Sequence, residues 1–358
     1  MSVKRLMKII NEYIVNRRFN VKKKYQYKSL KENMEKTGYY EGSDEEFKEK
    51  VLPYWEKYGI TPKKEYFQYY GYLTQEFNPR FIPDDLYYAD MYRFLNDIRY
   101  DEFLENKIYL KYLYHDLKQP RMITKYVNGF FINPNDEIIA KEEALDAILS
   151  EKNVLIKPSD SWKGIGVKKV DTSNKDEVLK IINDYMKNGD FIIQEILIQS
   201  NQMNSFNPSS VNTIRVITLL VNNKVEILSA IVRIGKKDSF VDNYAQGGKV
   251  RPIDVETGML RTFELQDEKA IYKDENGNDL KSELLVSFDK VKEIVKHHSR
   301  LPSLRILGWD FAIDENNEPV VIEINAYVGD NQREDGPAYG KFTDTLLEEY
   351  VKYRDKKK

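Results

Sequence analysis

The 358-residue chain contains no cysteine and only three histidines. Without thiols it can form neither a disulfide nor a thiolate metal site, and it has no cysteine nucleophile. His297 and His298 are adjacent, so they face different ways, and no third ligand lies at a useful spacing from them. We therefore interpret both as ordinary surface or packing residues.

The chain also lacks an apolar run long enough to span a bilayer, and it lacks a signal-peptide pattern at its start. Neither sign of charge is in excess, because 56 Lys and Arg stand against 58 Asp and Glu. A hydrophobic content of 41% with 32% charged residues is typical of a soluble globular protein. We expect a cytoplasmic protein that binds no nucleic acid, with two domains or one multi-lobed body.

Basic residues are nevertheless concentrated in residues 1–28, where nine Lys and Arg accompany a single acid, Glu12. The apolar residues there fall at helical spacing and predict an amphipathic helix: Val3, Leu6, Met7, Ile10 and Ile14. Such a helix either packs on its own domain, the commoner case, or makes a peripheral contact with an anionic membrane surface. Helical patterns broken by glycine and proline continue from there, so residues 1–100 are predicted to form a helical N-terminal region.

The stretch from Leu304 to Asp330 carries the clearest chemical pattern. It predicts two strands joined by a polar turn over residues 314–318. Alternation in the first strand places Asp310 on the face opposite to Leu307, Trp309, Phe311 and Ile313. Alternation in the second places two polar residues, Glu323 and Asn325, opposite to Val320, Ile322 and Ile324. Two carboxylates and an amide oxygen would then converge on a cleft and suit Mg²⁺; the alternative is an amphipathic hairpin with a solvated polar face.

A second pattern surrounds Lys157, which ends a predicted strand and is followed by a loop as far as Gly166. Small residues in this loop would let backbone N–H groups close on phosphate oxygens: Ser159, Ser161, Gly164 and Gly166. The loop lacks the Walker pattern, since no Gly-Lys-Ser/Thr opens a helix. A glycine-containing hairpin turn is the simpler alternative.

Two arginines lie inside apolar strands, Arg215 in residues 210–221 and Arg233 in residues 224–234. Arginine is rare in a buried strand unless it is paired with an acid or binds an anion. Both interpretations stay open at this point. A second glycine loop follows, from Asn243 to Lys249.

In chain order these segments resemble the ATP-grasp superfamily: a Lys-Pro strand end with its loop, a Gln-Glu strand, Arg-bearing strands, an Asn…Gly-Gly loop and Asp…Glu-x-Asn. They are most similar to the sugar-transfer-associated ATP-grasp group of polysaccharide gene clusters. That likeness covers about residues 80–350 and rests on FIPDDLYYADMYRFLN, VNTIRVITL, DNYAQGGKVRPIDVETG and GWDFAIDENNEPVVIEIN. It implies an α+β ATP-grasp fold whose two α+β lobes enclose the nucleotide, a small lobe at residues 101–200 and a large lobe at residues 201–358.

The resemblance also implies a role for each candidate residue. Mg²⁺ would be held by Asp310, Glu323 and Asn325. The γ-phosphate of ATP and the reacting carboxylate would meet the catalytic residues Arg215, Arg233 and Asn243. The nucleotide phosphates would contact Lys157 and one of Lys107 or Lys111, under the loop that carries Ser159, Ser161, Gly164 and Gly166. The adenine would meet Glu195 and the backbone near Ile198.

The implied activity is that of an ATP-dependent carboxylate–amine ligase that works through an acyl phosphate. Its small-molecule substrates would belong to capsular or other surface-polysaccharide assembly, for example an amino acid and a sugar acid. Two alternatives are a phosphotransferase acting on a sugar hydroxyl and a nucleotide-binding assembly factor without turnover. After Asn325 the chain runs Ala-Tyr-Val-Gly instead of a small residue followed by Pro-Gly, which indicates an unusual acceptor pocket. The acid, the amine and the oligomeric state are not predicted.

Overall fold

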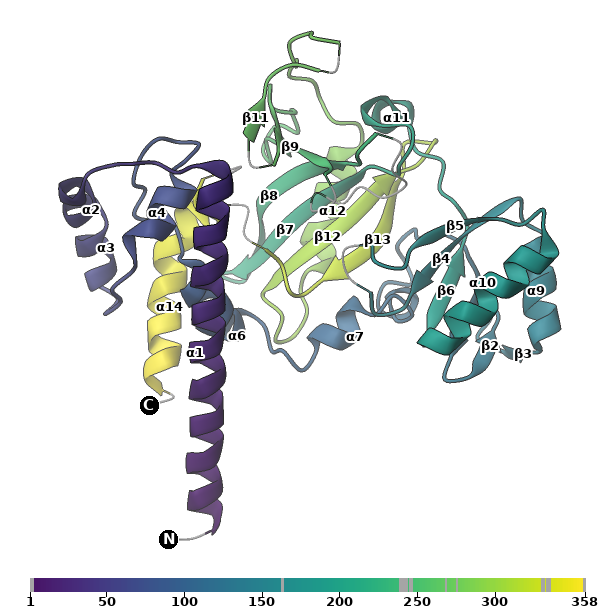
Figure 1. Cartoon of the computed structure of the whole chain (residues 1–358), viewed down its shortest axis with the longest axis horizontal. Coiled ribbons are helices and arrows are strands. Elements are labelled where there is room, and N and C mark those ends of the chain that lie inside the picture. The colour runs from purple at the N-terminus through teal and green to yellow at the C-terminus, as the bar shows by residue number, and fades with distance from the viewer. Residues whose placement is uncertain are drawn as a thin grey trace.

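The computed structural model describes residues 3–161, 164–237, 244, 247–267, 269–274, 276–329, 332 and 336–356, with the backbone alone for residues 3–5, 7–16 and 18. An N-terminal helical region is followed by a six-stranded sheet and a seven-stranded sheet, and the last helix returns to the N-terminal region (Figure 1). The two sheets belong to separate lobes.

One long helix, α1 (Val3–Thr37), opens the N-terminal region, and short helices follow it. Local sequence signals explain where two of these helices begin. The side chain of Ser43 caps α2 by accepting a hydrogen bond from the N–H of Glu46. Pro53 lies in the first turn of α3, where a backbone N–H has no helical partner and its absence costs nothing. The short helices are α2 (Asp44–Lys50), α3 (Leu52–Glu56), α4 (Lys64–Tyr70), α5 (Asp84–Leu86), the π-helix η1 (Tyr87–Met91), α6 (Tyr92–Leu95), α7 (Asp101–Glu105) and α8 (Leu110–Leu113).

The six-stranded antiparallel sheet has the strand order β3-β2-β1-β6-β4-β5. Two helices, α9 (Lys141–Leu149) and α10 (Lys175–Asn188), cover one of its faces, and Val154 and Ile156 lie in the core that they form. The intervening Leu155 and Lys157 line a cleft on the other face. The strands are β1 (Met122–Val127), β2 (Phe130–Ile132), β3 (Ile138–Ile139), β4 (Asn153–Pro158), β5 (Lys168–Asp171) and β6 (Phe191–Gln194).

The seven-stranded antiparallel sheet has the order β11-β10-β9-β8-β7-β12-β13 and lies between two helical layers. One face packs against α12 (Phe288–His298), with Val291 and Trp309 in a common core. The opposite face packs against the N-terminal region and α14 (Thr343–Lys356), which follows η3 (Gly340–Phe342). After α11 (Asn201–Phe206) come β7 (Thr213–Val221), β8 (Lys224–Ile234), β9 (Lys249–Ile253), β10 (Glu264–Gln266), β11 (Lys269–Ile271), β12 (Ile306–Ile313) and β13 (Pro319–Asn325).

Residues 106–115 contain one short helix, α8, and a helix does not begin at Asn106. The side chain of Asn106 accepts a hydrogen bond from the N–H of Ile108, and the N–H of Lys107 is bonded to the carbonyl of Ser159 instead of to a helical partner. Residues Leu104, Leu110 and Tyr114 pack with β12 in the large-lobe core. The lobe boundaries drawn from the sequence stay a prediction.

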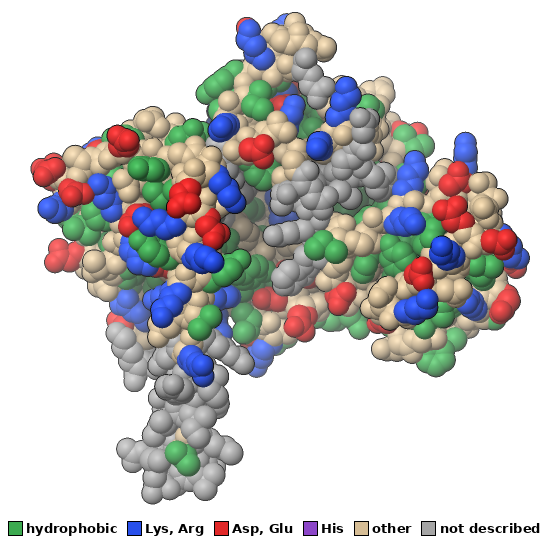
Figure 2. Space-filling view, in the orientation of Figure 1, with side chains coloured by type: hydrophobic (Ala, Val, Ile, Leu, Met, Phe, Trp, Pro, Cys, Tyr) green, Lys and Arg blue, Asp and Glu red, His purple; other side chains and the backbone are tan. Residues whose placement is uncertain are grey.

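Two further expectations concern the balance of charge on the surface and a membrane contact of the N-terminal helix. Basic and acidic side chains are mixed over the face seen in Figure 2. No helix in the part of the chain that the structure describes is long and apolar enough to cross a membrane. The predicted apolar stripe of residues 3–14 falls almost wholly on side chains outside the described set.

Candidate functional site

The hairpin of β12 and β13 forms as predicted, with Asp310 directly opposite Glu323. The predicted apolar face of β12 is buried in the core against α12. In β13 the simple alternation is wrong for Val320 and Ile322, because a β-bulge after the Asp310–Glu323 pair places Phe311 opposite Val321 and Ala312 opposite Val320. Val321 therefore enters the core, and Ile322 lines the cleft beside Glu323.

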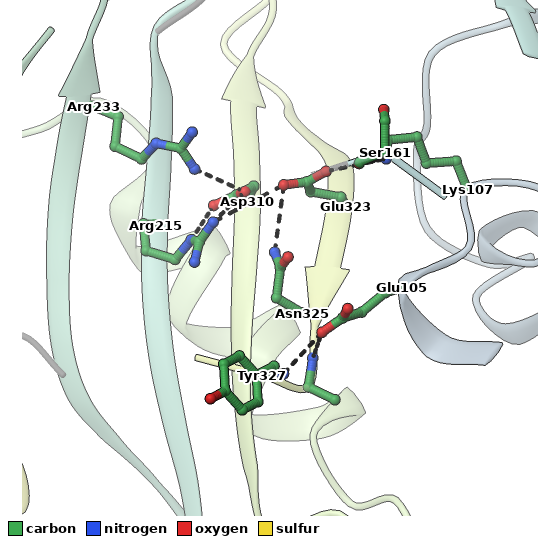
Figure 3. Close-up of polar contacts among 10 residues, drawn as sticks. Glu105, Lys107, Ser161, Arg215, Arg233, Asp310, Glu323, Asn325 and Tyr327 are labelled. Atoms are coloured by element: carbon green, nitrogen blue, oxygen red, sulfur yellow. Dashed lines mark hydrogen bonds and ion pairs between the residues drawn. The ribbon is translucent and has the colours of Figure 1, made fainter. Parts of the chain in front are cut away.

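Asp310 is ion-paired with both candidate arginines. Strand β7 pairs with β12 so that Arg215 lies opposite Asp310, and its Nη2 donates to Asp310 Oδ2 at 2.7 Å while its Nε donates to Oδ1. Arg233 Nη1 on β8 donates to the same Oδ2 at 3.0 Å (Figure 3). Burial by itself would raise the pKa of Asp310, but the two guanidinium groups outweigh it and hold that pKa well below its usual value. Asp310 is therefore ionised, and it orients both arginines.

Glu323 has a different environment although it is the cross-strand neighbour of Asp310. Its carboxylate oxygens lie 3.8 Å from Lys107 Nζ, 4.0 Å from Arg215 Nη2 and 3.5 Å from Asn325 Nδ2 (Figure 3). Burial and then the negative charge of Asp310 raise the pKa of Glu323. Glu323 is thus paired more loosely than Asp310, at 3.8 Å from Lys107 and 4.0 Å from Arg215.

These residues fit a magnesium ion that arrives with a phosphate compound. Among the described residues no group of three or more His, Cys, Asp or Glu could hold a metal. Mg²⁺ is commonly bound through only one or two carboxylates together with substrate phosphates, so Asp310, Glu323 and the amide oxygen of Asn325 are sufficient. A carboxylate has about four lone-pair positions, so the arginine bonds to Asp310 leave it able to act as a ligand.

A cleft of about 890 Å³ connects the two lobes at this hairpin. Both lobes contribute cationic side chains, Lys157 from β4 of the small lobe and Arg233 from β8 of the large lobe. Among the described residues, its lining is Lys107, Pro120, Leu155, Lys157, Ser161, Gly164, Val167, Glu195, Ile196, Leu197, Val211, Thr213, Arg233, Asp310, Ile322 and Glu323.

Lys107 ties the loop after Lys157 to the hairpin. Its Nζ donates to the carbonyl of Ser161 at 2.7 Å and its backbone N–H to the carbonyl of Ser159 at 3.0 Å. Gly164 and Gly166 have φ values of +69° and +73°, and a Cβ on Gly166 would lie 2.8 Å from Cγ of Pro158. Glycine is therefore required where this loop turns back against its own strand.

The predicted adenine-contacting residues lie at the junction of the lobes. Glu195 lines the cleft, and its carboxylate accepts hydrogen bonds from the backbone N–H and the Nε of Arg121 at 2.9 and 3.3 Å. Ile196 and Leu197 line the cleft as well. Ile198 does not; its side chain is exposed and its carbonyl accepts from the N–H of Glu315.

Five other described candidates do not line the cleft: Lys111, Ser159, Gly166, Arg215 and Asn325. Lys111 Nζ donates to the carbonyl of Pro134 and contacts Asp136 Oδ2 at 3.1 Å. Asn325 touches the site only through Glu323. Asn243 lies outside the described residues.

Glu105 on α7 positions the backbone at the end of β13, and the sequence analysis did not identify this role. Its Oε1 accepts hydrogen bonds from the N–H groups of Ala326 at 3.0 Å and Tyr327 at 2.8 Å, just after Asn325 (Figure 3). Burial raises the pKa of Glu105. The helical spacing around Glu105 gives no signal for this contact, because Ala326 and Tyr327 lie 221 and 222 residues further along the chain.

An α+β pair of lobes with a charged cleft between two antiparallel sheets and an Asp…Glu-x-Asn hairpin at its edge defines an ATP-grasp protein. The model of the sugar-transfer associated ATP-grasp family matches residues 87–332, and the chain belongs to that family. The match spans both sheets and the described part of the site.

Solved structures are similar at low identity. D-alanyl-alanine synthetase A from Vibrio cholerae is 15% identical, with a TM-score of 0.43, over 70% of this chain and 65% of that chain. D-alanine–D-alanine ligase from Helicobacter pylori is 18% identical, with a TM-score of 0.42, over 70% of this chain and 61% of that chain. An L-amino acid ligase from Bacillus licheniformis is 16% identical, with a TM-score of 0.39, over 70% of this chain and 48% of that chain. The chain spans less than two thirds of the length of each. No curated protein matches the sequence.

Proposed function

We propose that the protein is an ATP- and Mg²⁺-dependent ligase that joins a carboxylic acid to an amine through an acyl phosphate. The observation that carries this proposal is the convergence of Lys107, Arg215 and Arg233 on the Asp310–Glu323 pair. Phosphoryl transfer depends on positioning and charge neutralisation more than on a nucleophilic side chain, and this cluster supplies both.

The chain's own residues divide into those for the nucleotide and those for the reacting carboxylate. Lys107 and Lys157 would bind the phosphates, and Glu195 with the adjoining backbone would meet the adenine. Arg215 and Arg233, oriented by Asp310, would hold the carboxylate oxygen that attacks the γ-phosphorus. Mg²⁺, held by Asp310, Glu323 and Asn325, would neutralise charge on the transferred group. Asn243 would act beside the arginines.

In the second half of the reaction, the amine nitrogen forms a bond to the acyl carbon, the carbon–oxygen bond to phosphate breaks, and the nitrogen loses a proton. The loop of residues 159–166 would close over the cleft and exclude water, since hydrolysis would destroy the acyl phosphate. The contact of Lys107 with Ser161 gives that loop a fixed point beside the hairpin.

The family is described as sugar-transfer associated. This supports a place in the assembly of surface polysaccharide, with a sugar acid as the carboxylate and a cytoplasmic location for the reaction. The basic residues of the N-terminal helix would suit a peripheral contact with the membrane on which such polymers are assembled.

Calorimetric titration of ATP, with and without Mg²⁺, tests the proposal before either substrate is known. We expect micromolar binding that requires Mg²⁺ and is lost in Glu323→Gln, with Glu318→Gln on the exposed turn of the same hairpin as the matched control. Absence of binding to folded wild-type protein would overturn the proposal. Binding that survives Glu323→Gln would overturn the metal assignment.

A further inference from the structure

Strand β13 forms one edge of the seven-stranded sheet, and β12 is its neighbour there. An edge strand carries backbone N–H groups that the sheet itself leaves without acceptors. In this protein two points outside the sheet supply acceptors. The N–H of Val321 donates to the carbonyl of Lys118 at 2.9 Å. The N–H groups of Ala326 and Tyr327, just after β13, both donate to Oε1 of Glu105, at 3.0 and 2.8 Å.

The two candidate metal ligands of β13, Glu323 and Asn325, lie between these two points in the sequence. At the first point the acceptor is the backbone carbonyl of Lys118, which any residue would supply. At the second point the acceptor is the carboxylate of Glu105, and a charged acceptor holds N–H groups more strongly than a neutral one. The position of Asn325 therefore depends on the side chain of Glu105.

The ring of Tyr327 is held from the N-terminal side of the chain. It packs edge-on against the ring of Tyr92, with centroids 4.8 Å apart, and lies 5.5 Å from the ring of Tyr88. The hydroxyl of Tyr92 donates to Oδ2 of Asp101 at 2.6 Å, and Asp101 lies one helical turn before Glu105 on α7. Helix α7 thus holds the backbone of Tyr327, while η1 and α6 hold its ring.

The segment of residues 105–107 also reaches the other half of the site. Nζ of Lys107 lies 3.8 Å from Glu323 and donates to the carbonyl of Ser161 (Figure 3). One short segment therefore fixes the end of β13 relative to the cation that faces Glu323 and to the loop after Lys157. Such precision matters for Mg²⁺, which demands nearly ideal octahedral geometry at about 2.0–2.1 Å, so that a small displacement of one ligand weakens binding.

We infer that Glu105 is a positioning residue for the metal site, whose carboxylate holds the end of β13 so that Glu323 and Asn325 meet one divalent cation together. This rests on the proposed ligase function. Glu105 does not line the cleft, and it acts through the backbone N–H groups of residues 326 and 327. Partners of this kind, outside the ligand set itself, commonly change metal affinity by about 10–100-fold when they are removed.

Three variants test the inference. Glu105→Ala removes the acceptor, Glu105→Gln keeps a neutral acceptor oxygen, and Glu102→Ala changes an exposed residue of the same helix as the control. Mn²⁺ replaces Mg²⁺, because both ions suit oxygen ligands and Mn²⁺ has an electron paramagnetic resonance spectrum that reports on its coordination. Glu105→Asp, which is one methylene shorter, takes the place of Glu105→Ala if urea unfolding shows that this variant is not folded.

Calorimetry measures the affinity for Mn²⁺ with adenylyl imidodiphosphate, and the spectrum is recorded with all of the Mn²⁺ bound. We expect Glu105→Ala to weaken binding about tenfold or more and to change the spectrum of the bound ion. Glu105→Gln should restore most of the affinity together with the wild-type spectrum, and Glu102→Ala should match the wild-type protein in both.

Wild-type affinity in Glu105→Ala would overturn the inference. Weaker binding with an unchanged spectrum would overturn it as well, because the contact would then serve stability alone. The wild-type protein separates this result from the proposed function: if it does not bind the nucleotide with Mn²⁺, the proposed function fails. If it binds and Glu105→Ala binds equally well, only the inference fails.

Discussion

At the scale of single residues, Asp310 and Glu323 are neighbours in one register with opposite electrostatic environments. Two guanidinium groups hold the pKa of Asp310 low, while burial and the charge of Asp310 raise the pKa of Glu323. The Asp310 carboxylate is neutralised by the two arginines within the protein. The Glu323 carboxylate is available to a bound cation.

Substitution should therefore separate stability from binding. Asp310→Asn leaves two arginines without their anion, and because these side chains are 19% and 18% exposed we expect a loss near the lower end of the buried-pair range, about 3 kcal/mol in the free energy of unfolding. Glu323→Gln should leave stability nearly unchanged. Urea unfolding of both variants measures the difference; equal losses would contradict the assigned roles.

The choice between Lys107 and Lys111, left open by the sequence, becomes a second prediction. Lys107 contacts Ser161 and faces Glu323, whereas Lys111 is bound to Asp136 and Pro134 outside the cleft. We expect Lys107→Met to weaken binding of Mg²⁺ and ATP by about tenfold, the effect of roughly 1.4 kcal/mol. Lys111→Met is the matched control and should bind as wild type. A larger loss in Lys111→Met would reverse the assignment.

At the scale of elements, the turn between β2 and β3 is held by Asp136. Its carboxylate accepts hydrogen bonds from Lys125 at 2.6 Å, Lys111 at 3.1 Å and the hydroxyl of Tyr112 at 2.5 Å. Partial burial would raise the pKa of Asp136, but these donors outweigh it and the pKa is lowered well below its usual value. The folded state thus favours the ionised carboxylate.

The lowered pKa of Asp136 determines how its contribution to stability changes with pH. A carboxyl whose pKa is depressed on folding contributes stability above its unfolded pKa, about 3.9, and loses it as the pH falls towards the folded value. Since the side chain is 37% exposed, we expect Asp136→Asn to cost about 0.5–1 kcal/mol at pH 7 and progressively less below pH 4. Melting temperatures across this range, with exposed Asp146→Asn as control, measure it. A difference that grows on acidification would contradict the argument.

Elements with strong local patterns were predictable from the sequence, and long-range details were not. Helices α9, α10 and α12 and the β12–β13 hairpin follow directly from periodicity. The bulge that turns Ile322 into the cleft depends on strand pairing, and the Asp310–Arg215–Arg233 cluster depends on the register of three strands. Glu105 acts on backbone N–H groups more than two hundred residues away, and no local pattern encodes such a contact.

At the scale of the whole molecule, the described residues form three large hydrophobic cores and a small fourth cluster of Ile231, Val250 and Leu265, arranged on two sheets. The small-lobe core contains only residues between 123 and 193, whereas the two faces of the seven-stranded sheet share their cores with α12 and with the N-terminal region. Helix α14 joins the C-terminal end of the chain to the N-terminal region, since Leu347 lies in the same core as Leu30 and Tyr350 donates a hydrogen bond to Asp90.

We expect the small lobe to unfold separately from the rest. Ile182→Ala and Leu347→Ala each remove a fully buried side chain and should cost roughly 2–5 kcal/mol. Hydrogen exchange followed by mass spectrometry should show faster exchange confined to residues 122–194 in the first variant and to the N-terminal region, β7 and α14 in the second. Uniform acceleration in either variant would mean that the lobes unfold as one unit, and the result also locates the lobe boundaries.

The balance of charge around the hairpin affects how fast a ligand arrives. The chain has a net charge of −2, yet three cations around the hairpin pair, Lys107, Arg215 and Arg233, outnumber its two carboxylates. The third acid that lines the cleft, Glu195, is paired with Arg121. A positive field confined to a cleft of a slightly acidic protein accelerates the encounter with a polyanion without attracting it elsewhere. The association rate constant, more than the dissociation rate constant, should then fall as ionic strength rises.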